Sequence, residues 1–173
     1  HKALQRGVNA PLTTSAGRLF DAAAALLGLC LSTRYEGEAA MALEYAATRA
    51  STSFSLPPIA IVASPDAPLV LDWRPTLSAL VAIAPQEAAD SLARGFHAAL
   101  ADAIVATAIH AAIPDVLLTG GCFQNALLVD MTCDRLDAAG FTPHLHRRVP
   151  PNDGGIAVGQ AAFASHPRLE ETR

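Results

Sequence analysis

Two glycine-rich turns near the C-terminus contain the residues best suited to chemistry. The first holds Gly120 and Gly121 and is followed by Asn125, and the second is an Asn-Asp-Gly-Gly run around Asp153. Each turn joins an apolar, strand-like run to an alanine-rich, helix-like run. Paired glycines let a backbone turn sharply and approach a ligand closely, and a helix start just beyond presents free N–H groups to that ligand. Two such turns in one domain indicate a nucleotide or acyl-phosphate site.

The local chemistry of these residues leaves structural interpretations open. Gly120-Gly121 with Asn125 either contacts a phosphate or ribose or forms only a tight strand-to-helix turn. Asp153 is either a metal ligand or acid/base group, or an N-cap, a position that Asp and Asn fill very commonly. Asp21 either binds a ribose or is a surface carboxylate at a helix start. The first turn is neither G-x-G-x-x-G nor a Walker loop, which excludes Rossmann and P-loop sites.

The carboxylates and paired histidines elsewhere in the chain form weaker patterns. Glu36 and Glu38 could act as an acid/base pair, but we expect Glu38 at a helix start and Gly37 in a special backbone conformation. His144 and His146 share one face of a strand and could bind a metal together, although a solvated edge is the simpler interpretation.

One histidine and one cysteine are of residue types that could also take part in chemistry. His97 follows Phe96 on a long helix, where a partly buried histidine is the default expectation. Cys122 follows Gly121 near a helix start, which can lower the pKa of a thiol. No histidine close in sequence could act as its base, so we do not expect a catalytic thiol.

Composition limits the function classes that need to be considered. The chain has 173 residues, of which 51% are hydrophobic, 16% charged and 5% aromatic, so alanine, leucine and valine should fill one core. The chain has a net charge of −4, and its sequence shows no basic stripe of the kind found in nucleic-acid binders. The sequence contains no run of about 18 apolar residues, the length that would indicate a membrane span. Three irregularly spaced cysteines suit the cytoplasm.

Apolar periodicity predicts a helical first half followed by alternating strands and helices. Helices are expected at residues 2–7, 17–31, 38–49, 75–84, 85–112, 124–139 and 155–164. Strands are expected at residues 59–62 and 69–73, as a hairpin, and at 116–119 and 141–146. The order strand, helix, strand, helix in the last third indicates an α/β sheet, and the two glycine turns then follow its two strands.

Taken together, these segments resemble the hydrogenase maturation carbamoyltransferases. The matching runs are residues 9–21 (NAPLTTSAGRLFD), 35–41 (YEGEAAM), 96–97 (FH), 120–125 (GGCFQN) and 151–157 (PNDGGIA). They keep their order and cover nearly the whole chain, most thinly over residues 50–85. The set is specific although each motif alone is weak.

The resemblance implies a piece of a long, multidomain protein whose last domain is shared with threonylcarbamoyl transferases of tRNA modification. The implied fold is α/β, namely one lobe of an actin-like, sugar-kinase-like (ribonuclease H-like) ATPase fold, helix-rich with a small mixed sheet. We expect residues 1–173 to form the second lobe of the C-terminal carbamoyl-transfer domain.

The family converts carbamoyl phosphate and ATP to carbamoyl adenylate and passes the carbamoyl group to a C-terminal cysteine of a partner maturation protein. The product supplies the cyanide ligands of nickel–iron hydrogenase. The resemblance therefore implies ATP or carbamoyl adenylate as cofactor, a divalent metal (zinc or iron) in the complete domain, and the acceptor protein as partner. The first lobe and the adenylating domain of the same protein are further implied partners.

The resemblance also assigns roles by position. It implies that Asp21, Gly37 and Asn125 contact the adenylate nucleotide, that Gly120 and Gly121 lie against its phosphate, and that Asp153 is a metal ligand. The nucleophile is the partner's thiolate, so no catalytic residue is assigned in this chain.

The family's metal site also needs two histidines from an H-x-x-x-H stretch in the first half of the domain, which this chain lacks. We therefore expect the chain alone to hold little metal and to have no transfer activity, because metal affinity comes from several ligands fixed together. The alternatives are a sugar-kinase-like phosphotransferase lobe and a non-enzymatic module that docks a partner.

Overall fold

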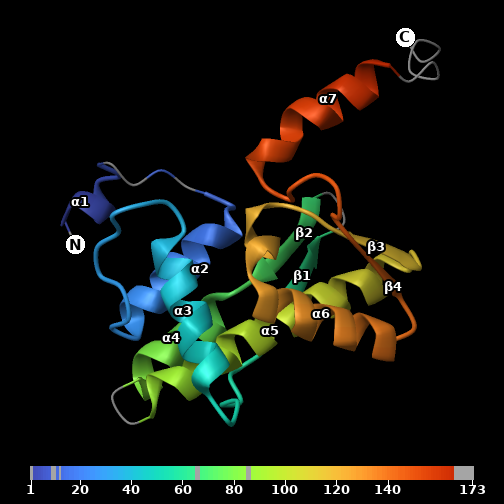
Figure 1. Ribbon diagram of the computed structural model, residues 1–173. Coiled ribbons are helices and arrows are strands. Elements are labelled where there is room, and N and C mark those ends of the chain that lie inside the picture. Colours follow the sequence, from blue (N-terminus) through green and yellow to red (C-terminus); the bar gives the residue numbers. More distant parts are fainter. Residues whose placement is uncertain (1, 9–10, 12, 65–66, 85–86, 166–173) are drawn as a thin grey trace.

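The structure is a computed structural model that describes the chain except residues 1, 9–10, 12, 65–66, 85–86 and 166–173. Helices dominate the first part of the chain and alternate with strands in the second (Figure 1). The first part contains α1 (Lys2–Gln5), α2 (Ala16–Leu26), α3 (Glu38–Arg49), β1 (Ala60–Ser64), β2 (Ala67–Asp72), α4 (Arg74–Ile83) and α5 (Ala89–Ala111). The second contains β3 (Asp115–Leu118), the 3-10 turn η1 (Gly121–Gln124), α6 (Ala126–Ala138), β4 (Thr142–Leu145), the 3-10 turn η2 (Asp153–Gly155) and α7 (Ile156–Ala164).

Helix α5 is the centre of the core, with α3 and α6 packed against it and α2 against α3. The largest fully buried side chains include Phe20, Leu43, Leu92 and Phe96. Alanine is the commonest buried apolar residue, which lets neighbouring helices approach closely because axial separation depends on side-chain size. The expectation that valine would also fill the core was wrong: every buried apolar side chain among the described residues is Ala, Leu, Phe, Ile or Met.

Helix α5 is also, among the described helices, the one long and apolar enough to cross a membrane by length and composition. Half of its most apolar stretch is buried inside the protein. A core helix covered on several sides reaches this apolarity without any lipid contact, and the buried face of α5 is explained by its packing against the other helices.

The strands form two separate two-stranded sheets. Strands β1 and β2 make an antiparallel hairpin in which Ile61 lies opposite Leu71. Strands β3 and β4 are parallel, with Leu118 opposite Leu145, and α6 makes the crossover that parallel pairing requires. Both pairing modes of the predicted mixed sheet are thus present, and the carboxyl ends of β3 and β4 lie at one edge.

Two predicted helix boundaries were wrong. Helix α2 ends at Leu26 and leaves Cys30 in a loop, because the N–H of Leu29 turns back to donate to the carbonyl of Ala24 at 2.9 Å. The helix predicted from residue 85 begins at Ala89, and Pro85 lies outside the described residues. The other predicted elements are present at closely similar positions.

Helix α7 projects away from the other helices (Figure 1). None of its nine residues is buried, and the sequence IAVGQAAFA contains no charged side chain. Ile156, Val158 and Phe163 each expose more than half of their surface. An apolar helix without a covering partner is unusual at the surface of a soluble domain.

Candidate functional site

The two glycine turns lie side by side at one edge of the parallel sheet. One turn follows β3 and the other follows β4, and the N–H of Gly120 donates to the carbonyl of Pro151 at 2.8 Å. Ligands of open α/β sheets bind outside the carboxyl ends of the strands. The turns therefore form one continuous surface in the place where such ligands bind.

A cavity of about 830 Å³ beside these turns brings together residues from four segments of the chain. It is lined by five of the six residues to which the resemblance assigns a role: Asp21, Gly37, Gly121, Asn125 and Asp153. Gly120, the sixth, is not among its lining residues, and its N–H donates to the carbonyl of Pro151. The folded chain thus gathers positions that are up to 132 residues apart (153 − 21).

Gly120 and Gly121 differ in backbone conformation and in their contribution to the first turn. Gly120 has φ +105° and ψ 158°, a backbone conformation that is essentially restricted to glycine. Gly121 has an ordinary conformation, and a Cβ built on it would meet no other atom within 4 Å. In the described part of the chain, the N–H groups of Gly121 and Cys122 donate to no other backbone group. Gly120 thus shapes the turn, whereas Gly121 leaves open space and a free donor at the cavity.

Asn125 is a buried N-cap that also forms part of the cavity wall. Its Oδ1 accepts a hydrogen bond from the N–H of Leu128 at 2.8 Å, which caps α6. Its Nδ2 lies 2.9 Å from Nε2 of His97. The helix expected at residue 124 therefore begins at Ala126, after a 3-10 turn that ends at this cap.

His97 is fully buried, which corrects the expectation of a partly buried side chain. Its Nδ1 lies 2.8 Å from the carbonyl oxygen of Ala93. Burial lowers the pKa of His97 below its usual 6.5, while the hydrogen bond to Ala93 and the negative charge of Glu44 oppose this shift. The ring is therefore neutral at physiological pH.

The opposite wall comes from α2 and the start of α3. Asp21 pairs with Arg18 at 2.9 Å, one helical turn earlier. Gly37 precedes α3 with φ +82°, which confirms its predicted special conformation. Glu38 begins α3 as expected, and the guanidinium and N–H of Arg34 lower the pKa of its carboxyl group. Glu36, by contrast, lies on the cavity wall.

Asn152, and not Asp153, caps the second turn. Its Oδ1 accepts from the N–H of Gly154 at 3.1 Å, which leaves the carboxylate of Asp153 exposed at the cavity. The N-cap interpretation of Asp153 was therefore wrong. Among the described residues, no three His, Cys, Asp or Glu side chains are close enough together to hold a metal ion. The described residues therefore offer such an ion at most an incomplete set of ligands.

The weaker candidates of the sequence have structural roles. His144 pairs with Asp115 at 2.7 Å and His146 contacts Thr119 at 2.9 Å, both at an exposed edge. Burial raises the pKa of the Cys122 thiol, which disfavours the thiolate. The exposed histidine edge agrees with the sequence-based expectation.

Comparison with known proteins identifies the family. Residues 1–160 match the family model described as "Carbamoyltransferase, Kae1-like Domain, second subdomain". The chain belongs to this family. It is 44% identical over 168 residues to the carbamoyltransferase HypF of Rhodobacter capsulatus, covering 92% of this chain and 21% of that protein. It is 40% identical over 156 residues to HypF of a Synechocystis species, covering 90% of this chain and 20% of that protein.

Solved structures of this carbamoyltransferase family have the same fold. A crystal structure of full-length HypF in a phosphate- and nucleotide-bound form superposes with a TM-score of 0.82 at 29% identity, over 94% of this chain and 22% of that one. The T. kodakarensis HypF structure gives 0.74 at 30% identity, over 94% and 21%. The actin-like lobe inferred from the sequence is thus confirmed as a Kae1-like subdomain. The chain spans about a fifth of the length of the relatives it matches.

Several cavity residues of this Kae1-like subdomain received no role from the sequence, namely Tyr35, Gln124 and Asn152, which lie in the matching runs, and Glu44, which lies outside them. Glu44 shares a helix face with Ala40 and Met41, so helical spacing from Gly37 could have indicated it.

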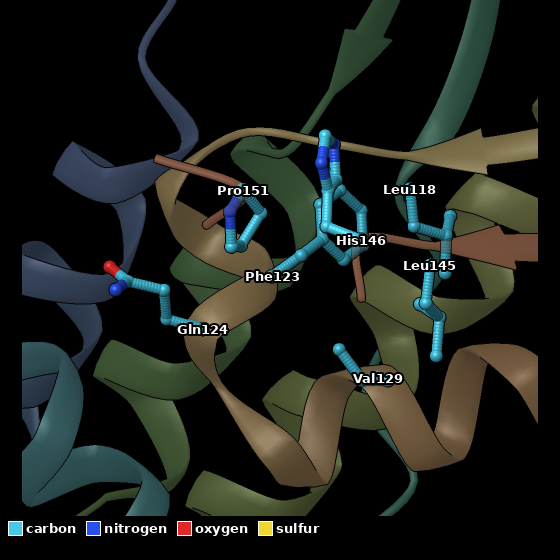
Figure 2. A pocket seen from close by; sticks show the side chains of 7 residues that line it. All are labelled: Leu118, Phe123, Gln124, Val129, Leu145, His146 and Pro151. Atoms are coloured by element: carbon cyan, nitrogen blue, oxygen red, sulfur yellow. The ribbon is translucent and has the colours of Figure 1, made fainter. Parts of the chain in front are cut away.

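A second cavity, of about 360 Å³, lies on the other side of η1 among apolar side chains (Figure 2). Figure 2 shows Phe123 pointing into that cluster and Gln124 pointing away from it, toward α2.

Proposed function

We propose that this chain forms one half of the nucleotide cleft of a carbamoyltransferase in hydrogenase maturation. In the complete protein, carbamoyl phosphate and ATP give carbamoyl adenylate, and the carbamoyl group passes to a C-terminal cysteine of a partner maturation protein. The observation that carries this proposal is the convergence of Asp21, Gly37, Gly121, Asn125 and Asp153 on one cavity. The nucleotide-bound state of a relative with the same fold supports it.

The transfer step needs positioning more than it needs a nucleophile from this chain. The partner's thiolate attacks the carbamoyl carbon, a C–S bond forms, and the bond between that carbon and the adenylate phosphate oxygen breaks to release AMP. AMP is already a good leaving group, so holding the mixed anhydride in line supplies most of the rate enhancement. The carboxylates of Asp21 and Glu36 can accept hydrogen bonds from ribose hydroxyls, and the free N–H of Gly121 can donate to the phosphate.

The charge of the cavity supports the idea that it is incomplete. Among the described residues, four carboxylates line it, from Asp21, Glu36, Glu44 and Asp153, against one guanidinium, that of Arg18. An anionic phosphate is repelled by such a wall unless cations oppose it. The opposing first subdomain of the Kae1-like domain is the proposed source of those cations, as it is of the two histidines that the metal site needs.

The proposed zinc or iron does not fit the described residues of this chain alone. Asp153 offers one exposed carboxylate, and no described group of three ligating side chains accompanies it. Divalent ions are held by several ligands fixed together, so we propose Asp153 as one ligand of a site completed by the first subdomain. When bound, such an ion would supply electrostatic stabilisation of the phosphate or the carbamoyl oxygen.

The same neighbouring subdomain is proposed to cover α7. The helix follows the Asp153 turn directly, has no charged residue and exposes Ile156, Val158 and Phe163. Covering it would remove apolar surface that is otherwise in contact with water.

We place the complete protein in the cytoplasm, consistent with three free cysteines.

A shift-mapping experiment and one variant test this proposal. AMP titrated into the full-length polypeptide, with the residues of this chain isotopically labelled, should shift the amide signals of Gly37, Gly121 and Asn125, and leave those of α4 unchanged. In the full-length polypeptide that contains this chain, Asp153→Ala should lose bound metal and carbamoyl transfer, while Asp115→Ala, an exposed carboxylate away from the cavity, should lose neither. Shifts confined to other regions, or a fully active Asp153→Ala variant, would contradict the assignment.

A further inference from the structure

The proposed function leaves His97 unused, although it is the most buried titratable side chain near the cavity. It belongs to α5, has no exposed surface and lies against Phe20 and Phe96 with ring centroids 5.5 and 6.2 Å away. An imidazole in such apolar surroundings needs partners for both ring nitrogens, because an unsatisfied buried polar atom is costly. His97 has both partners, and they determine where its proton lies.

The carbonyl of Ala93 assigns the proton to Nδ1. A carbonyl oxygen can only accept a hydrogen bond, and it lies 2.8 Å from Nδ1. In a neutral imidazole one nitrogen donates and the other accepts. Nε2 of His97 therefore has a lone pair directed at the side chain of Asn125.

That lone pair and the N-terminus of α6 impose the same orientation on the carboxamide of Asn125. Nδ2 donates to Nε2 of His97 at 2.9 Å, and Oδ1 accepts from the N–H of Leu128 at 2.8 Å. A flipped carboxamide would place its oxygen against the lone pair of His97 and its NH₂ against the N–H of Leu128. Both contacts would then become repulsive.

We propose that His97 is a positioning residue of the nucleotide site, acting through Asn125. This inference rests on the proposed function for the identity of the ligand. The ring holds the carboxamide so that one Nδ2 hydrogen and one Oδ1 lone pair stay free on the cavity wall. A group that both donates and accepts, such as a ribose hydroxyl, is the matching ligand chemistry. Asn125 is 6% exposed, so it has little freedom to find this orientation unaided.

The competing explanation is that His97 only fills space between Phe20 and Phe96. Two amide substitutions separate the two roles because each keeps one ring nitrogen's function. Asn places its amide nitrogen near the position of Nδ1 and can still donate to Ala93, but it offers nothing to Asn125. Gln places its amide oxygen near the position of Nε2 and can still accept from Asn125. Both lose the aromatic ring equally.

The orientation itself is tested without any nucleotide. In the isotopically labelled chain, a scalar coupling across the hydrogen bond should connect Nδ2 of Asn125 with Nε2 of His97. The nitrogen shifts should show Nδ1 protonated and Nε2 unprotonated. A proton on Nε2 would overturn the inference whatever the nucleotide affinity is.

The consequence for the ligand is tested by AMP affinity in the full-length polypeptide, with unfolding measured in parallel. His97→Asn should weaken AMP binding about tenfold or more, and Asn125→Ala should weaken it to a similar extent, which corresponds to about one lost hydrogen bond. His97→Gln should stay within about threefold of the wild type although both variants are less stable. Equal affinities for the two folded variants would show a purely structural role. Absence of AMP binding by the wild type would instead refute the proposed function, and the nucleotide role of His97 with it.

Discussion

Substituting alanine for each glycine of the first turn separates backbone shape from ligand approach. Gly121 has an ordinary backbone conformation, and a Cβ on it would meet nothing within 4 Å. Gly121→Ala should therefore change the free energy of unfolding by no more than about 0.5 kcal/mol. The added methyl group would nevertheless project from the wall of the cavity, where the adenylate phosphate is proposed to lie.

The expected loss of affinity follows from the contact that the methyl group displaces. Losing one hydrogen bond between a backbone N–H and a charged phosphate costs about 1.5–3 kcal/mol. At about 1.4 kcal/mol for each factor of ten, Gly121→Ala should weaken AMP binding by about 10- to 150-fold. Gly120→Ala is the matched control. Its φ of +105° with ψ of 158° should cost about 1–3 kcal/mol of stability.

Two measurements test the pair. Urea unfolding followed by circular dichroism should rank Gly120→Ala below the wild type and Gly121→Ala beside it. Calorimetric titration of AMP into the full-length polypeptide should show the loss for Gly121→Ala. A folded Gly121→Ala variant that binds AMP within about twofold of the wild type would refute the close approach of a phosphate. An unstable Gly121→Ala variant would refute the open space around this residue.

Three further predictions concern stability and dynamics. Because burial holds the pKa of His97 below the 6.5 of the unfolded chain, the unfolded state binds more protons below about pH 6.5, and stability should fall as the pH drops from there through the folded pKa. The negative charge of Glu44 opposes this lowering of the His97 pKa, and the positive charge of Arg94 adds to it. A His97→Gln variant that loses as much stability in acid as the wild type would contradict the assignment of this loss to His97. Gly95→Ala should destabilise the chain by about 1–3 kcal/mol, because the new Cβ would overlap the carbonyl of Phe54. Gly159→Ala is the control, because a Cβ at this position meets nothing within 4 Å, and chemical unfolding should show no loss of stability for it. Equal losses for Gly95→Ala and Gly159→Ala would exclude the overlap with Phe54. Amide hydrogens of α7 should exchange in the isolated chain much faster than those of α5, since no residue of α7 is buried, and strong protection of α7 would show that it packs on the chain itself.

Helix and strand positions were predictable because apolar spacing and turn residues act locally. The glycine turns, the parallel strand pair and the helix between them follow from such patterns, and the structure contains them all. The boundaries that failed depended on contacts that sequence spacing does not reveal. Helix α2 stops early because the chain folds back from Leu29 to Ala24.

The residues that line the cavity were predictable in part, but their arrangement was not. Resemblance pointed to Asp21, Gly37 and Asn125, and the folded chain places all three on one cavity. It did not separate Gly120, whose backbone conformation shapes the turn, from Gly121, which lines the cavity. Nor did it identify Asn152 as the cap that leaves Asp153 exposed.

The element order, the two glycine turns and the family could be inferred from residue types at fixed spacing along one chain. The folded structure was needed to show that the turns are joined through Gly120 and Pro151, and that His97 and Asn125 meet although 28 positions separate them. Hydrogen bonds between distant segments form only after the helices have packed, because packing creates the buried geometry in which an imidazole and a carboxamide can orient one another.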